Sequence, residues 1–242
     1  MRSKKKIKRF IKNYLPTISS YWKAIKAIKN QYAINEKKIG RLGKNSDIAL
    51  PASFDNPKNV FIDDYVRIQP NSRIINHNGK FIIKRYSAIA ANFVAIPNNH
   101  ISTVGIPQYI LGPSHINDIE GDIIIEESVW IGANVVMLQG ASRVGRGAVI
   151  GACSLVNKPI PPYAVAVGIP AKIVASTFSI DQILEHEKAI YPKEERFSKE
   201  YLEQLFTEHF QEKKSFGTSY ISEKDKSLLD SIKKELNIKN YE

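Results

Sequence analysis

The chain has 242 residues, of which 43% are hydrophobic and 24% charged, and these values are typical of globular proteins and exclude a largely disordered chain. Its single cysteine, Cys153, excludes an internal disulfide and a four-cysteine zinc site. The sequence has neither a run of about 18 apolar residues nor the apolar core of a secretory signal, so a cytoplasmic location is the expectation.

The formal net charge of +11 is concentrated at the N-terminus. Residues 1–44 contain 14 of the 35 Lys and Arg and one acid, Glu36, which gives +13 and leaves −2 for the remaining 198 residues. Because the body of the chain has no general attraction for polyanions, no nucleic-acid partner is predicted.

Residues 1–38 form a basic amphipathic arm. Apolar residues recur there every three or four positions with basic residues between them, which predicts helix, and Pro16 is expected to divide that helix in two. The apolar positions are Ile7, Ile11, Tyr14, Leu15, Ile18, Trp22, Ile25 and Ile28. Two interpretations fit this pattern: the apolar stripe packs on the body of the protein, or residues 1–35 make a peripheral contact with lipid at the inner face of the membrane.

From residue 39 to 175 the helical period is absent, and an aliphatic residue returns every six positions instead. The repeated residues are Ile62, Ile68 and Ile74; Ile83, Ile89 and Ala95; Ile125, Ile131 and Met137; and Val144, Ile150 and Val156. Small residues stand four places after many of them: Ser72, Ser87, Ala141, Ala148 and Ser154. A chain that turns a corner every six residues, and returns above itself after three short strands, produces this spacing. The sequence therefore predicts a parallel β-helix domain over residues 39–175, with about six coils whose aliphatic residues stack inside.

Two regions depart from this repeat. Residues 97–121 interrupt the count with a long loop that contains His100 and His115, and a loop of that length within a compact domain is usually functional or mobile. Residues 176–242 return to a helical period and form a C-terminal helical extension. Helices are expected at about 180–190, 198–212 and 223–236, and this extension is expected to cap the open end of the β-helix or to pack on a neighbour.

The segment from Gly121 to Val174 contains the motifs VWIGANV, AVIGACSLV, PPYAV and GIPAKIV, in that order and closely spaced. It resembles the hexapeptide-repeat acyltransferases, and among them the sugar O-acetyltransferases of the maltose, galactoside and capsular-polysaccharide type. The resemblance covers about residues 60–175. It implies a left-handed β-helix, a sense that the spacing alone does not predict because parallel crossovers are normally right-handed.

What the resemblance implies is transfer of acetyl from acetyl-CoA to a sugar hydroxyl of a cell-surface polysaccharide or its precursor, at a cleft between subunits of a homotrimer and without a metal. His100 is the expected general base, in a direct reaction with no covalent intermediate. In the family an asparagine that contacts the acceptor precedes the catalytic histidine by eight residues, as Asn92 precedes His100. Asn98 and Asn99 either bind acceptor hydroxyls or satisfy turn backbone, and His115 is the rival base.

The resemblance also assigns the acetyl-CoA side. It places Ala133 where a backbone N–H faces the thioester oxygen and Ala152 where a backbone carbonyl receives the pantetheine arm, and it counts Gly132 among the cofactor-binding residues. Trp130 would flank the cofactor channel, the alternative being simple packing. Two lysines match cationic positions near the CoA phosphates, the alternative being solvated loop residues: Lys158 and Lys172.

Two features depart from the family pattern: the acid expected near the catalytic histidine, and the length of the loop that follows it. No acid lies between His100 and Asp118, so either Asp118 or Glu120 folds back to orient the histidine, a backbone carbonyl serves, or another group is the base. The 30 residues from His100 to Trp130 indicate an enlarged loop, so small-sugar specificity is not carried over.

Three other functions are compatible with a β-helix of this kind to different degrees. An N-acetyltransferase acting on an amino sugar needs a similar base, and a non-catalytic trimeric scaffold would need none. A zinc hydratase with the same coil is set aside, because no two histidines are five residues apart. Cys153 has no histidine near it in the sequence and is assigned a structural role.

Overall fold

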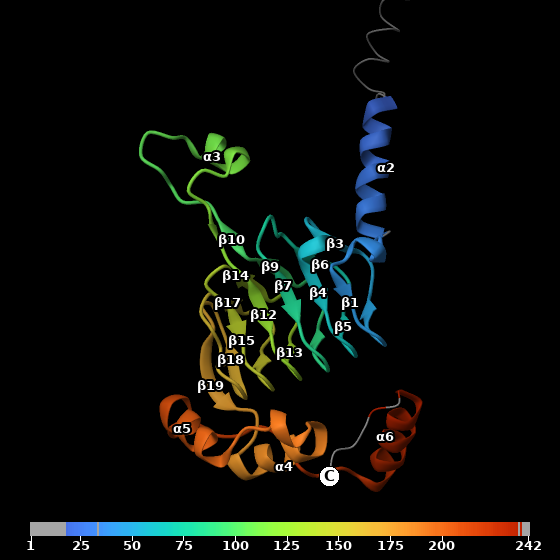
Figure 1. The fold of residues 1–242 in the computed structure, drawn as a ribbon, viewed down its shortest axis with the longest axis vertical. Coiled ribbons are helices and arrows are strands. Elements are labelled where there is room, and N and C mark those ends of the chain that lie inside the picture. The colour runs from blue at the N-terminus through green and yellow to red at the C-terminus, as the bar shows by residue number, and fades with distance from the viewer. Residues whose placement is uncertain (1–17, 33, 237, 239–242) are drawn as a thin grey trace, which may run out of the picture.

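The computed structural model describes residues 18–32, 34–236 and 238 (Figure 1). The predicted helix before Pro16 therefore lies outside the described residues. The chain begins with helix α2 (Ile18–Tyr32) and the short 3-10 helix η1 (Glu36–Lys38), and then builds three sheets of mainly parallel strands. Each coil of the chain contributes one strand to each sheet in turn, and this is the architecture that the six-residue period predicts.

The strands are short, and their sheets have five, seven and five members. The first sheet contains β1 (Arg41–Leu42), β4 (Val60–Ile62), β7 (Phe81–Ile83), β12 (Ile123–Ile125) and β15 (Arg143–Val144). The second contains β2 (Asp47–Ile48), β5 (Arg67–Ile68), β8 (Ala88–Ile89), β13 (Trp130–Ile131), β16 (Val149–Ile150), β18 (Ala164–Val167) and an antiparallel final strand, β19 (Lys172–Ser176). The third contains β3 (Ala52–Phe54), β6 (Ser72–Ile74), β9 (Val94–Ile96), β14 (Val136–Leu138) and β17 (Leu155–Val156).

The register of these strands confirms the predicted stacking. In the second sheet Ile131 pairs with Ile89 on one side and with Ile150 on the other. The first sheet aligns Ile62, Ile83, Ile125 and Val144, and the third aligns Ile74, Ala95, Met137 and Val156. All of these side chains are at most 1% exposed. The core is thus a column of aliphatic side chains inside a three-sided prism.

The corners of the prism impose a second regularity. The small residues that the sequence places near corners are buried: Ser72, Ser87, Ala141, Ala148 and Ser154. At the corner between the second and third sheets, Asn71, Asn92, Asn134 and Cys153 have φ between 59° and 63°. Asparagine adopts this left-handed region more readily than most residues, so backbone conformation is one reason for an asparagine at position 92.

The C-terminal helices lie where the sequence predicts them. They are α4 (Ile180–Ile190), α5 (Lys199–His209) and α6 (Glu223–Leu236), with the 3-10 helix η3 (Lys193–Glu195) after α4. Ser179 and Gln182 form the expected capping box at the start of α4. Ile183 of α4 and Leu202 of α5 are buried in the same hydrophobic cluster as the prism interior. Helices α4 and α5 therefore extend that core, as the first interpretation of the extension requires.

Helix α2 differs, because its apolar side chains are not buried on the body. Tyr21, Trp22, Ile25 and Ile28 are 52–66% exposed. In Figure 1 the helix stands away from the N-terminal end of the prism. Of the two interpretations of the basic arm, packing on the body is wrong for this part of it. Among the helices that the structure describes, none is long and apolar enough to cross a bilayer.

We expect Ile131→Ala to lower the free energy of unfolding by about 2–5 kcal/mol, because it opens a cavity in the middle of the aliphatic column. The control Val174→Ala removes a side chain that is 45% exposed and should change the value by less than about 0.5 kcal/mol. Urea denaturation followed by circular dichroism measures both values. Equal losses in the two variants would contradict the account of the core.

Candidate active site

Residues 97–121 form an insertion between the third sheet and the next strand of the first sheet. Its base is a two-stranded antiparallel ladder, in which β10 (Asn98–Asn99) pairs with β11 (Ile119–Glu120). Gly121 N–H closes the base by donating to Pro97 O at 3.0 Å. The short helix α3 (Gln108–Ser114) lies near the tip, and the whole insertion projects from the prism (Figure 1).

The ladder brings together three chemically active side chains from separate parts of the insertion. His100 directly follows β10 and Asp118 directly precedes β11, so pairing of the two strands sets these residues opposite each other. His100 Nδ1 lies 2.7 Å from Asp118 Oδ1, and His115 Nδ1 lies 2.7 Å from Asp118 Oδ2. One carboxylate therefore orients two imidazoles.

Hydrogen bonding favours the ionised form of Asp118. The hydrogen bond from His100, followed by the weaker one from His115, holds the pKa of Asp118 below its ordinary value despite opposing desolvation. Asp118 is thus an acceptor-only carboxylate at neutral pH, and each imidazole donates to it through Nδ1–H. In a neutral histidine this tautomer leaves Nε2 as a proton acceptor. The side chain of Asp118 is 5% exposed, whereas that of His100 is 39% exposed and can meet a substrate.

The structure therefore selects among the options left open for orienting His100. Asp118 folds back to it, whereas Glu120 accepts a hydrogen bond from Asn78 Nδ2. Sequence reasoning missed His77, whose ring stacks on His115 with centroids 4.1 Å apart. Since these two histidines are 38 positions apart and lie outside the repeat, no sequence signal could have joined them.

The same cluster offers ligand types that a transition-metal ion accepts. Candidate ligand atoms of His100, His115 and Asp118 all lie within 4.8 Å of one another. Hydrogen bonds between the imidazoles and the carboxylate already account for this geometry. The arrangement is consistent with acid–base chemistry by the side chains themselves.

The predicted acceptor residues occupy different places. Asn98 and Asn99 form β10, immediately before His100. Asn98 Oδ1 is buried and has no hydrogen-bond partner among the described residues. Asn92 instead lies at a prism corner, where its Nδ2 donates to Asn134 Oδ1 at 3.0 Å. No hydrogen bond between Asn92 and His100 is present in the described part of the chain.

The residues predicted to hold the donor gather at the same corner, one coil apart. Cys153 N–H donates to Ala133 O at 2.8 Å, so Ala133 and Ala152 lie on adjacent coils. A Cβ at Gly132 would come within 2.6 Å of Ala152 N, so glycine is required for this approach. Trp130, 48% exposed, leads into the corner from β13. Two exposed lysines lie farther along the chain: Lys158 after β17 and Lys172 in β19.

Among the described residues, no hydrogen bond or ion pair links His100 or Asp118 of the insertion to Ala133 or Ala152 at this corner.

Known proteins that are similar to this chain include acetyltransferases. No protein-family model matches the chain. A putative acetyltransferase of Schizosaccharomyces pombe, C18B11.09c, is 36% identical over 126 residues, or 52% of this chain and 57% of that protein. The galactoside O-acetyltransferase of Escherichia coli is 26% identical over 147 residues, or 61% of this chain and 68% of that protein. The chain thus spans little more than half of the first relative.

Solved structures of an acetyltransferase are also similar to this chain. The hexapeptide-repeat-containing acetyltransferase VCA0836 from Vibrio cholerae is 26% identical, with a TM-score of 0.56 over 66% of this chain and 90% of that one. Its complex with acetyl coenzyme A matches with a TM-score of 0.55 over 65% of this chain and 85% of that one. The similarity covers most of that protein.

The carboxylate of Asp118 should hold the insertion closed at neutral pH. Because its pKa is lowered, its contribution is present at pH 7 and is lost only as the pH falls through the folded-state value. We expect Asp118→Asn, which cannot accept from two imidazoles, to accelerate chymotrypsin cleavage after Tyr109 by at least about threefold at pH 7. Glu120→Gln keeps an acceptor for Asn78 and should leave the rate unchanged. Equal rates in all three proteins would show that the shared carboxylate does not order the insertion.

Proposed function

We propose that this chain is a hexapeptide-repeat acetyltransferase and that it transfers an acetyl group from acetyl-CoA to a sugar hydroxyl of a cell-surface polysaccharide or its precursor. The observation that carries the proposal is the pairing of His100 Nδ1 with Asp118, which leaves Nε2 of a partly exposed imidazole to accept a proton. Similarity to a structure complexed with acetyl coenzyme A supports the donor. We expect the β-helix to have the left-handed sense of the family.

The proposed reaction is a direct transfer. His100 Nε2 takes the proton of the acceptor hydroxyl while its oxygen attacks the thioester carbonyl. As the intermediate collapses, the C–S bond breaks and the imidazolium returns the proton to the departing CoA sulfur. The charge of Asp118 stabilises the imidazolium between these steps. Base and oxyanion donor both come from the chain, so the step needs no metal ion.

The prism corner that contains Ala133 and Ala152, called the donor corner below, supplies the groups that bind acetyl-CoA in this proposal. The backbone N–H of Ala133 meets the developing oxyanion, and the carbonyl of Ala152 receives the pantetheine amide. Gly132 allows the two coils to approach closely enough to present both groups. Trp130 flanks the channel. Two exposed lysines pair with the CoA phosphates: Lys158 and Lys172.

We place the complete site between copies of the chain in a homotrimer. The resemblance to the hexapeptide-repeat acyltransferases implies this arrangement, in which one copy would supply the base and its neighbour the thioester site. Asn98, whose buried Oδ1 has no hydrogen-bond partner among the described residues, would bind an acceptor hydroxyl together with Asn99. Asn92 would contact the acceptor from the donor corner.

An amine could replace the hydroxyl, because the same base would accept its proton. The alternative is therefore an N-acetyltransferase of an amino sugar, and paired acceptors with a hydroxyl or an amino group at one position would distinguish the two. A non-catalytic scaffold would have no use for an oriented base, and the ordered His100–Asp118 pair argues against it.

We expect His100→Ala to lower kcat/KM for CoA release by about 10²-fold or more, the usual scale for a lost general base. The assay measures free thiol from acetyl-CoA across a panel of sugars, nucleotide sugars and polysaccharide repeats. His209→Ala removes a partly exposed histidine at the end of α5 and should leave kcat/KM unchanged. If His115→Ala abolishes activity and His100→Ala does not, the base is His115.

Mixed trimers test the shared site. His100→Ala and Ala133→Leu should each be inactive alone, but coexpressed with different tags they should regain about a quarter of native activity, because random assembly pairs an intact base with an intact neighbouring corner at that frequency. Circular dichroism of each variant confirms folding. No recovery in purified mixed trimers would place the site within a single copy.

A further inference from the structure

Helix α2 presents an apolar face that nothing in the described chain covers. Its side chains Tyr21, Trp22, Ile25 and Ile28 fall within a sector of the helix and are all more than half exposed. A helix of 15 residues is marginal in water without packing on one face. Its exposed aromatic and aliphatic side chains therefore favour an apolar partner.

The charge of this segment restricts the partner. Between residues 18 and 32 the helix carries Lys23, Lys26 and Lys29 and no acid, and residues 1–17 contain seven Lys and Arg and no acid. A second copy of the same helix would place like charges against each other. A lipid surface with anionic headgroups complements both the apolar stripe and the lysines.

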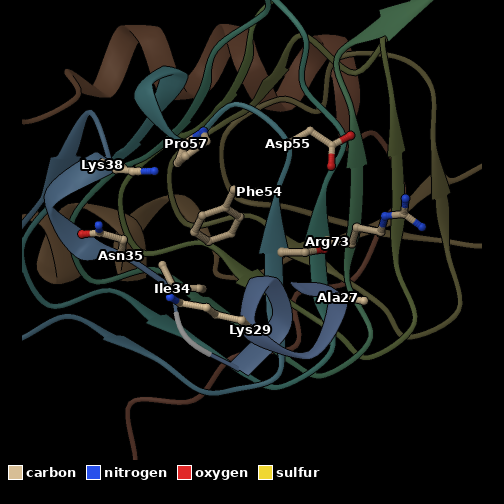
Figure 2. A pocket seen from close by; sticks show the side chains of 10 residues that line it. Ala27, Lys29, Ile34, Asn35, Lys38, Phe54, Asp55, Pro57 and Arg73 are labelled. Carbon is tan, nitrogen blue, oxygen red and sulfur yellow. The ribbon is translucent and has the colours of Figure 1, made fainter. Parts of the chain in front are cut away.

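Basic side chains continue into a cavity of about 740 Å³ at the base of α2 (Figure 2). Lys29 of α2, Lys38 of η1 and Arg73 of β6 line it, together with one acid, Asp55. The ring of Phe54 faces the middle of the cavity in Figure 2. Three cations against one carboxylate favour an anionic group beneath the helix, as a lipid phosphate would provide.

The insertion offers a second apolar surface on the same edge of the prism. Val104, Tyr109 and Ile110 near its tip are 102%, 92% and 49% exposed, and no Lys, Arg, Asp or Glu occurs from residue 86 to 117. In Figure 1, α2 and the insertion both project from the edge opposite α4, α5 and α6. An uncharged tip can approach a lipid surface without the cost of desolvating a charge.

We propose that these two surfaces form one docking face for an anionic lipid membrane, with the apolar side chains of α2 in the lipid interface and the tip of the insertion against it. The face comprises Tyr21, Trp22, Ile25, Ile28, Val104, Tyr109 and Ile110. Membrane docking goes beyond the acetyl transfer proposed above, because it assigns the protein a location at a lipid surface. Docking through this face would hold His100, at the base of the insertion, close to acceptors embedded in the membrane.

Sedimentation of the full chain with vesicles, without acetyl-CoA, tests the proposal. We expect at least tenfold tighter binding to phosphatidylcholine vesicles with 30% phosphatidylglycerol than to pure phosphatidylcholine, and weakening by salt. Trp22→Glu/Ile25→Glu should reduce binding at least tenfold, and Val104→Glu/Tyr109→Glu at least threefold. The matched control Phe216→Glu/Tyr220→Glu changes two exposed aromatic side chains that lie between α5 and α6, and it should bind as the native chain does.

Equal binding to both vesicles, or unchanged binding of either docking-face variant, would overturn the proposal. A change in the oligomeric mass of the Trp22→Glu/Ile25→Glu protein without a change in its vesicle binding would also overturn the proposal. That result would assign the face to contact between copies of the chain. Thiol release with a soluble acceptor should be unaffected in both docking-face variants. Loss of vesicle binding and absence of acetyl transfer are separate readouts, so the two proposals can fail independently.

Discussion

The structure depends on parallel pairing between successive coils. In each coil, every sixth residue points an aliphatic side chain into the prism. Inward residues of the middle coils have a partner directly above and below them, as Ile131 has in Ile89 and Ile150. A three-sided coil of this kind requires tight corners, and the corners require buried small side chains and left-handed backbone. Ala133 and Ala152, the residues proposed to hold the thioester, lie at such a corner, so the geometry of the proposed donor site follows from the packing of the core.

The acid–base cluster has a different physical origin. It lies on an insertion outside the repeat, held by a ladder of two residues in each strand and by the carboxylate of Asp118. In the proposed site the prism would present the donor and the projecting hairpin would present the base. The division allows the insertion to vary with the acceptor without disturbing the core, as loops on rigid scaffolds commonly do.

The sequence predicts the repeated parts of this molecule well and the unique parts poorly. The inward positions, the three parallel sheets and the starts of α4 and α6 follow from periods and caps that local sequence encodes. The contact between His100 and Asp118 does not, because strands as short as β10 and β11 carry no periodic signal. The stacking of His77 on His115 depends on where an insertion folds in space, and it has no counterpart in spacing. Amphipathicity likewise predicts α2 but cannot reveal that its apolar face lies uncovered.

The proposed acetyl transfer requires the imidazole of one copy to meet a thioester bound at the Ala133 corner of the next copy. A crystal structure with CoA bound examines this most directly. The account predicts the CoA sulfur beside Ala133 and Ala152, with His100 Nε2 of an adjoining copy about 3–4 Å away, as an attacking geometry requires. CoA bound at another part of the prism, or His100 remote from every CoA sulfur in the assembly, would contradict it.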